Sequence, residues 1–148
     1  MSRFLLVLLA MGCCTLFVNG QDDKKKSDSA LKLSEQIIGT WVFESGEMGG
    51  MPPPEEFTKV FKLKIMKGGK FSVDVPDQQH NGEYKLNENT KPAEIDFNHD
   101  GEERKGIIKL EKGKVYICVS EPGGTRPTKF ESKGDGAHFF MVLTREKK

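Results

Sequence analysis

The feature that most constrains the fold is an alternation of apolar and polar residues with a period of two, which runs through most of the chain after Thr40. It is clearest at residues 60–65, where Phe61, Leu63 and Ile65 share one face and lysines occupy the other. Such alternation indicates β-strands that bury one face. Because no long helical period interrupts it, the sequence predicts an all-β fold.

Turn residues divide this pattern into short strands. Lys67-Gly68-Gly69 joins residues 60–65 to the next alternating stretch, 71–75, and predicts a β-hairpin. Other turns are expected at residues 76–81, Asp100-Gly101, Lys112-Gly113 and 122–124. The pattern gives eight or nine strands, including one around Thr128 and Phe130 and a last one at residues 139–143.

Short strands with short connections predict either an antiparallel sandwich or an up-and-down barrel. We favour the barrel, because closure removes the exposed edges of the sheet. A short helix is expected within residues 30–38, before Gly39.

The amino-terminal residues have the pattern of a secretory signal. Residues 1–20 combine a positive charge at Arg3, an apolar run and small or β-branched residues before a polar stretch. We therefore expect a signal peptide at 1–20, a disordered polar linker at 21–29 and one domain at 30–148. The product would lie in the periplasm, the cell envelope or outside the cell. A degraded lipoprotein box at 10–13 leaves open a lipid anchor on Cys13.

Charge and cysteine content argue against nucleic acid as a partner and against an internal disulfide bond. Arg3 is one of 23 basic residues, and all 22 acidic residues follow Gly20, so the mature chain carries no net charge. A neutral chain has no electrostatic reason to bind nucleic acid. The mature chain has no transmembrane segment, and we expect a monomer. Cys118 would be its single cysteine, which excludes an internal disulfide.

Gly39-Thr40-Trp41 follows the expected helix and opens the first strand, and it resembles the Gly-x-Trp signature of lipocalins and related barrels. In that resemblance Trp41 plugs the closed end of the barrel. Arg145, at the end of the last strand, would lie across the Trp41 ring as a cation–π contact.

The longer pattern resembles a lipocalin-like domain family found in many copies in planctomycete bacteria. It comprises, in order, Gly39–Trp41, Gly82–Leu86, Lys91–Asp96, Gly106-Ile107, Ile117-Cys118, Arg126–Phe130 and Leu143–Arg145. The resemblance covers about residues 31–145 and departs at Ile108, where the family has a tyrosine. It implies a barrel and carries no established biochemical role.

The residues that could carry chemistry form no recognisable catalytic set. His80, His99 and His138 are far apart in the sequence, and no pair has metal-ligand spacing. A loop of Asp96, His99, Asp100 and Glu102 is better interpreted as a solvated turn than as a cation site. Cys118 alternates with buried-type residues and is expected to be a structural, unreactive thiol. We expect no enzyme activity, no cofactor and no metal.

Two features suggest ligand contacts. Met48 and Met51 lie within a glycine- and proline-rich connection at residues 46–54 that would form an adaptable lid over the barrel mouth, although a plain polyproline-type loop explains them too. Arg126 could bind an anion or a ligand carboxylate. The alternative is that Arg126 hydrogen-bonds backbone carbonyls or pairs with a nearby acid.

These observations predict a non-enzymatic exported binding module that takes a small apolar or amphipathic ligand in the barrel mouth. Bulky residues expected to face inward could instead fill so small a barrel: Trp41, Phe43, Phe61, Leu63, Phe71, Tyr84 and Phe97. The alternative function is then a protein-interaction or inhibitor module that acts through its loops or outer face.

Overall fold

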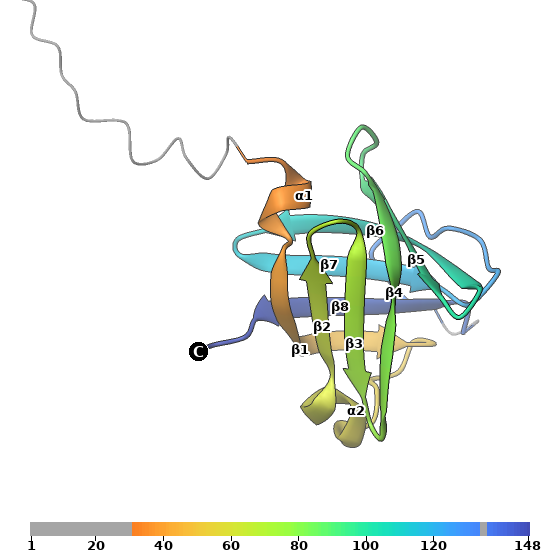
Figure 1. Ribbon diagram of the computed structural model, residues 1–148. Helices are drawn as coiled ribbons and strands as arrows, with labels where there is room; N and C mark the ends of the chain where they lie inside the picture. The colour runs from red at the N-terminus through yellow and green to blue at the C-terminus, as the bar shows by residue number, and fades with distance from the viewer. Residues whose placement is uncertain (1–30, 134–135) are drawn as a thin grey trace, which may run out of the picture. The chain divides into compact units, whose positions relative to one another are not determined.

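The computed structural model describes residues 31–133 and 136–148, and Figure 1 shows their arrangement as eight strands and two short helices. The amino-terminal elements are α1 (Leu33–Gln36), β1 (Gly39–Met48) and α2 (Glu55–Val60). The remaining elements are β2 (Lys62–Met66), β3 (Lys70–Val75), β4 (Gln78–Asn87), β5 (Ala93–His99), β6 (Glu102–Glu111), β7 (Lys114–Ser120) and β8 (His138–Arg145). The expected signal peptide and linker lie outside the described residues.

The eight strands form a closed antiparallel barrel in which every strand pairs with the next one along the chain. Strand β8 closes the barrel against β1, from Trp41 opposite Arg145 to Met48 opposite Phe139. The prediction of an all-β antiparallel barrel with a short amino-terminal helix is confirmed. None of the helices in the described part of the chain is long and apolar enough to cross a membrane.

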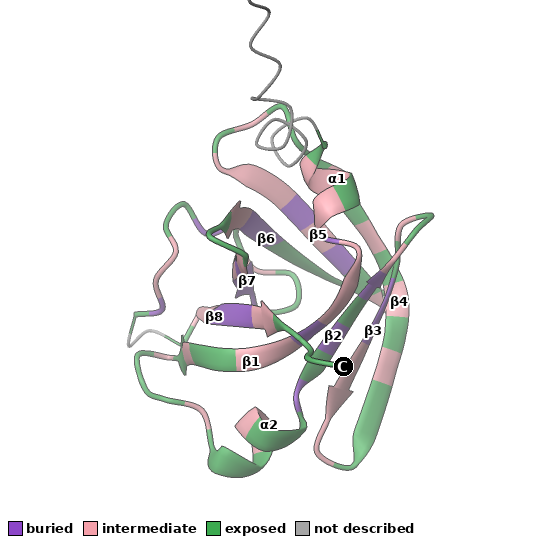
Figure 2. Cartoon of the chain, turned by 90° about the vertical axis from the view of Figure 1, so that its left-hand side faces the viewer, coloured by how far each residue is buried: buried purple, intermediate pink, exposed green. Residues whose placement is uncertain are grey.

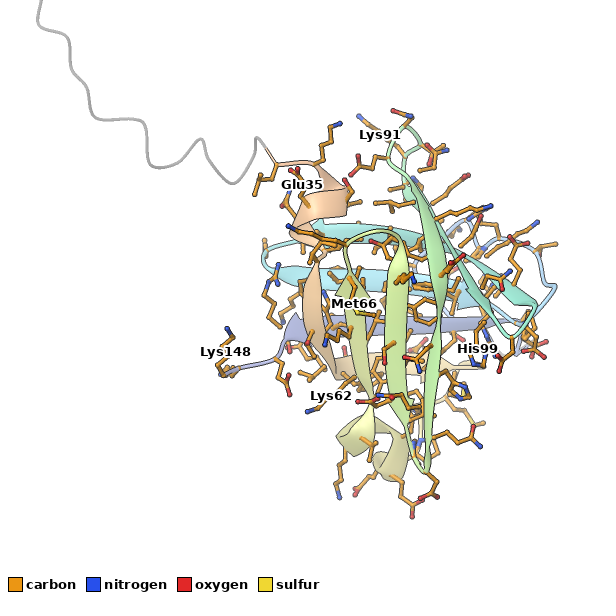
Figure 3. All side chains as sticks on the ribbon, in the orientation of Figure 1. Glu35, Lys62, Met66, Lys91, His99 and Lys148 are labelled. Carbon is orange, nitrogen blue, oxygen red and sulfur yellow. The ribbon has the colours of Figure 1, made fainter. Side chains whose placement is uncertain are left out.

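Up-and-down connectivity gives the barrel two different ends. Helix α1, the β2–β3 turn, the β4–β5 connection and the β6–β7 turn lie at one end, which we call the closed end. Helix α2, the β3–β4 and β5–β6 turns and the β7–β8 connection lie at the other, the open end. Figure 3 labels Glu35 and Lys91 at the closed end and His99 away from it.

The interior at the closed end is packed with side chains that are fully buried. These are Ile37, Trp41, Ile65, Ile95, Ile108, Val115 and Leu143. Six of these side chains lie at the inward positions of β1, β2, β5, β6, β7 and β8, where alternation places them, and Ile37 joins them from the end of α1. This layer forms the floor of the interior.

Gly39 and Arg145 explain the Gly-x-Trp pattern physically. Gly39 has a φ of 140°, and a Cβ there would lie 2.6 Å from Arg145 Nη1. Because only glycine leaves that space, Arg145 can reach across the Trp41 ring, with its guanidinium carbon 4.5 Å from the ring centroid. The guanidinium also donates hydrogen bonds to the carbonyls of Gln36 (2.6 Å) and Ile38 (3.0 Å) and ties α1 to the barrel.

The prediction of a strand around Thr128 and Phe130 is wrong. Residues 121–133 form no strand, and they connect β7 to β8 along the outside of the barrel. The physical reason is closure: β7 pairs directly with β8, so no free sheet edge remains for a ninth strand. Pro127 also lacks the backbone N–H that a strand ladder requires.

Helix α2 was not predicted from the sequence, which assigned Val60 to a strand. The helix follows Pro54 and carries Glu55 and Glu56 in its first turn, where carboxylates interact favourably with the helix dipole. It spans only six residues, too few to show a helical period. Figure 2 shows α2 as exposed and intermediate with no buried position, while the buried residues concentrate on the strands.

A candidate ligand-binding cavity at the open end

The open half of the barrel contains a cavity of about 770 Å³ that is open to solvent. Its walls are mainly apolar and come from α2 and from most of the strands. The apolar lining consists of Met48, Phe57, Phe61, Leu63, Phe71, Val73, Val75, Phe97, Ile117, Val119, Pro122, Phe139 and Met141. Its volume lies within the range of about 300–1,000 Å³ that is typical of small-molecule sites.

The bulky residues expected to fill the interior leave this space open. Phe61, Leu63, Phe71 and Phe97 line the cavity wall, while Trp41 belongs to the floor layer. Phe71 and Phe97 meet edge to face at 4.9 Å.

Gly82 permits that arrangement of rings. A Cβ at this position would lie 2.1 Å from the Asn98 carbonyl and 2.8 Å from the Phe71 ring. The absence of a side chain at Gly82 therefore leaves room for the tip of the Phe71 ring next to β4.

Helix α2 borders the open end through Phe57. Its ring contacts Phe61 at 5.2 Å, Phe139 at 5.6 Å and Phe43 at 6.2 Å between centroids. Phe57 therefore joins β1, the residue before β2 and β8 in one aromatic cluster at the cavity opening. The helix has no buried residue, so the wall it supplies is held by few contacts.

Polar side chains surround the outer part of the cavity. His80 Nδ1 lies 3.1 Å from His99 Nε2, and both rings line the cavity with His138. His99 also lies 3.1 Å from the Asp100 carboxylate. The sequence analysis treated these histidines as distant from one another. The expected pairing of β4 with β5 could have indicated the contact, because it places the start of β4 beside the end of β5.

Arg104, Glu102, Ser120 and Glu121 complete the polar lining. Arg104 pairs with Phe97 in the β5–β6 ladder, and Glu102 pairs with His99. Directly paired residues point to the same face of a sheet, so Arg104 faces inward like Phe97. Among the described residues, the Arg104 guanidinium forms no ion pair.

The structure does not bring together all four residues that the sequence analysis weighed as a loop cation site and preferred to interpret as a solvated turn. Asp96 lies on the outer wall, where its carboxylate is 2.6 Å from Arg126 Nη1, away from His99 and Glu102 at the open end. Within residues 31–133 and 136–148, no group of three histidine, cysteine or acidic side chains could hold a metal ion.

The two methionines of the predicted lid take different positions. Met48 lines the cavity, whereas Met51 is 68 % exposed and is not part of the lining. A pair of backbone hydrogen bonds joins them, at 2.7 and 3.2 Å, and closes the turn that ends β1. The structure brings one of the two methionines to the cavity and leaves the other outside its lining.

Arg126 lies outside the cavity. Its guanidinium donates to the Gly106 carbonyl at 2.7 Å and to Asp96 at 3.1 Å, and it lies 3.7 Å from Glu94. The hydrogen bond to Asp96 and the negative charges of Asp96 and Glu94 raise the pKa of Arg126. These contacts are those of the alternative interpretation, in which the arginine pairs with an acid and a carbonyl. They hold the β7–β8 connection against β5 and β6.

Cys118 is buried beneath the same connection, and its thiol contacts the Glu131 carbonyl at 3.4 Å. Burial raises the pKa of this thiol to about 11. A thiol that keeps its proton at neutral pH is a poor nucleophile, which fits the structural role expected from the strand pattern.

Comparison with known proteins adds no relative. No family model, no curated protein and no solved structure matches the chain. The resemblance to a planctomycete lipocalin-like family stays a prediction.

Proposed function

We propose that this protein is an exported, non-enzymatic binding protein that holds a small apolar or amphipathic ligand in the open half of its barrel. The observation that carries the proposal is the cavity of about 770 Å³, with apolar walls and a polar opening. Burial of a ligand's apolar surface there contributes about 25 cal/mol for each Å² removed from water. Polar groups at the opening would fix its orientation.

The cavity favours this function over the interaction module that was the alternative. That alternative requires a filled barrel, and the packed layer around Trp41 occupies only the closed end. Export is proposed from the signal-like pattern of residues 1–20, which lie outside the described residues.

The direct test is native mass spectrometry on residues 21–148, purified gently from the envelope fraction of the source cells. We expect a bound small molecule that is lost when the protein is denatured. A ligand-free mass from this preparation, together with no binding of added amphiphiles, would contradict the proposal.

A matched pair of variants separates the cavity from the barrel as a whole. Val73→Trp adds an indole to the cavity wall, whereas Asn81→Trp adds the same ring at an exposed outward position of neighbouring β4. We expect Val73→Trp to lose the ligand and Asn81→Trp to retain it, with both variants keeping the β-type circular dichroism spectrum. Equal retention would show that the ligand binds elsewhere.

A further inference from the structure

We propose that the ligand is a single-chain zwitterionic amphiphile, with its apolar chain in the cavity, its anionic group at Arg104 and its cationic group at Glu102 and Glu121. This inference rests on the proposed function and names the class of ligand for the same cavity. It depends on the order in which chemical groups follow one another from the floor to the opening.

The apolar part of the ligand fits the deep walls. Val119, Ile117 and Met141 continue from the packed floor toward the opening, and Phe71 and Phe97 form the opposite wall. Within the described residues, no charged side chain lines this deep part, since the charged lining groups come from the open ends of β5, β6 and β7. An alkyl chain would therefore enter first and carry its head group outward.

The first charge met on the way out is positive. Arg104 lines the cavity at the level of Phe97 and is exposed to solvent at the opening, and its guanidinium forms no ion pair among the described residues. A guanidinium has five N–H donors and matches a phosphate or carboxylate in two-point geometry. His80 and His99, on adjacent strands, add ring nitrogens near the same part of the opening.

The second charge is negative. Glu102 occupies the next inward position of β6 toward the opening, and two residues of strand place it about 7 Å beyond Arg104 along the strand. Glu121 follows the last residue of β7, also at the open end. Other polar groups near it are His138, which contacts the Thr125 carbonyl, Ser120, whose hydroxyl donates to the Glu121 carbonyl, and Asp100, which contacts His99.

From the floor outward, the cavity presents apolar walls, then a positive charge, then negative charges. A complementary ligand carries an apolar chain, then an anionic group, then a cationic group. A ligand with only an anionic head would satisfy Arg104 and meet the repulsion of Glu102 and Glu121. A ligand with only a cationic head would leave Arg104 without a partner. A single-chain phospholipid with a quaternary ammonium head has its charges in the required order.

The experiment is isothermal titration calorimetry on the whole mature protein with four probes of equal chain length, each below its micelle-forming concentration. The probes are a lysophosphatidylcholine, the fatty acid, the fatty alcohol and the alkyltrimethylammonium ion. We expect the zwitterion to bind tightest, followed by the acid and the alcohol, with the cation weakest.

The variants assign each charge to its residue. Arg104→Gln should weaken the zwitterion and the acid about tenfold and leave the alcohol unchanged. Glu102→Gln should weaken the zwitterion and strengthen the acid. Lys105→Gln and Glu103→Gln remove the same charges from the alternate, outward positions of β6 and should change none of the four affinities.

The outcomes separate this inference from the function on which it rests. If no probe binds, this inference is overturned, and the proposed function falls with it only if the native mass is also ligand-free. If the alcohol binds as tightly as the zwitterion and Arg104→Gln changes neither, the cavity binds ligand and the charge assignment is wrong. If the acid binds tighter than the zwitterion, the cationic group has no partner at Glu102 and the zwitterionic class is excluded.

Discussion

The two ends of this barrel use the same strands for opposite purposes. At the closed end, Trp41 and its neighbours are fully buried, and Arg145 covers the indole from outside. At the open end, the inward positions of the same sheet line a cavity, and the covering helix α2 has no buried residue.

The difference teaches that alternation decides which residues face inward, while the size and placement of their side chains decide whether the interior is filled. Seven side chains make the closed-end layer, and the aromatic rings at the open end lie against one another on the wall. Stability should therefore depend mainly on the closed end and ligand binding on the open end. Each prediction below tests this division.

The largest effect is expected from Trp41→Ala. It removes a fully buried indole from the floor and should lower the free energy of unfolding by about 3–5 kcal/mol. Urea unfolding followed by circular dichroism measures the change. A loss below about 1 kcal/mol would show that the closed end is not the stabilising half of the barrel.

Arg145→Ala should have the next largest effect. It removes the contact over Trp41 and two hydrogen bonds to the carbonyls of Gln36 and Ile38, at a cost of about 1–2 kcal/mol because the side chain is exposed. Arg145→Lys keeps the charge without the planar guanidinium and should recover only part of the loss. If Arg145→Lys unfolds with the same free energy as wild type, Arg145 stabilises the barrel through its charge alone.

Phe57→Ala should cost only about 1 kcal/mol, because α2 packs on the open end with no buried residue. It should nevertheless speed ligand dissociation, since Phe57 links the aromatic cluster at the cavity opening. Stopped-flow displacement measures the rate. Thr58→Ala on the same helix serves as a control for helix stability, because Thr58 is absent from the cavity lining.

The Cys118 thiol reports on the connection that covers the outer wall beside the open end. Its pKa of about 11, against an ordinary value of 9.0, means that folding favours the protonated thiol. This contribution is fully present below pH 9.0 and is lost as the pH rises through about 11. Unfolding experiments at pH 8, 10 and 11 on wild type and Cys118→Ala should show the difference between them shrinking with pH.

The same residue gives a labelling test at neutral pH. Native protein should react with a thiol reagent far more slowly than protein in urea, because Cys118 is buried beneath the chain near Glu131. Rapid labelling of the native protein would mean that this connection opens readily.

The smallest effects are expected at the two methionines. Met51→Ser should change stability by less than about 0.5 kcal/mol and leave ligand binding unaltered, because Met51 is 68 % exposed and outside the cavity. Met48→Ser places a hydroxyl in the lining and should weaken binding of an apolar chain. Equal effects from both changes would show that the connection acts as a unit.

Much of this fold could be predicted from the sequence, because period-two alternation and turn residues report directly on strands. The ninth strand at Thr128 and Phe130 could not be excluded that way, since the exclusion comes from the pairing of β7 with β8 across the barrel. Helix α2 was too short to show a period.

The candidate site was less accessible to sequence reasoning than the fold. Met48 was singled out because it lies in a connection expected at the barrel mouth. The His80–His99 contact depends on how the open ends of β4 and β5 meet, and Arg104 on a register that pairs it with Phe97. Arg126 stands out in the sequence as much as Arg104, and only three-dimensional placement separates an outer-wall ion pair from an inward guanidinium.

The pairing of β1 with β8 also sets a condition on how the protein is made. Synthesis proceeds from the amino terminus, so β1 emerges early, and its partner along Trp41–Met48 is the last strand to appear. Until then one edge of β1 is unpaired, and the wall that Phe139 and Met141 supply to the cavity does not exist. A nascent chain lacking its final strand can therefore neither close the sheet nor retain a ligand, which makes binding a property of the finished molecule alone.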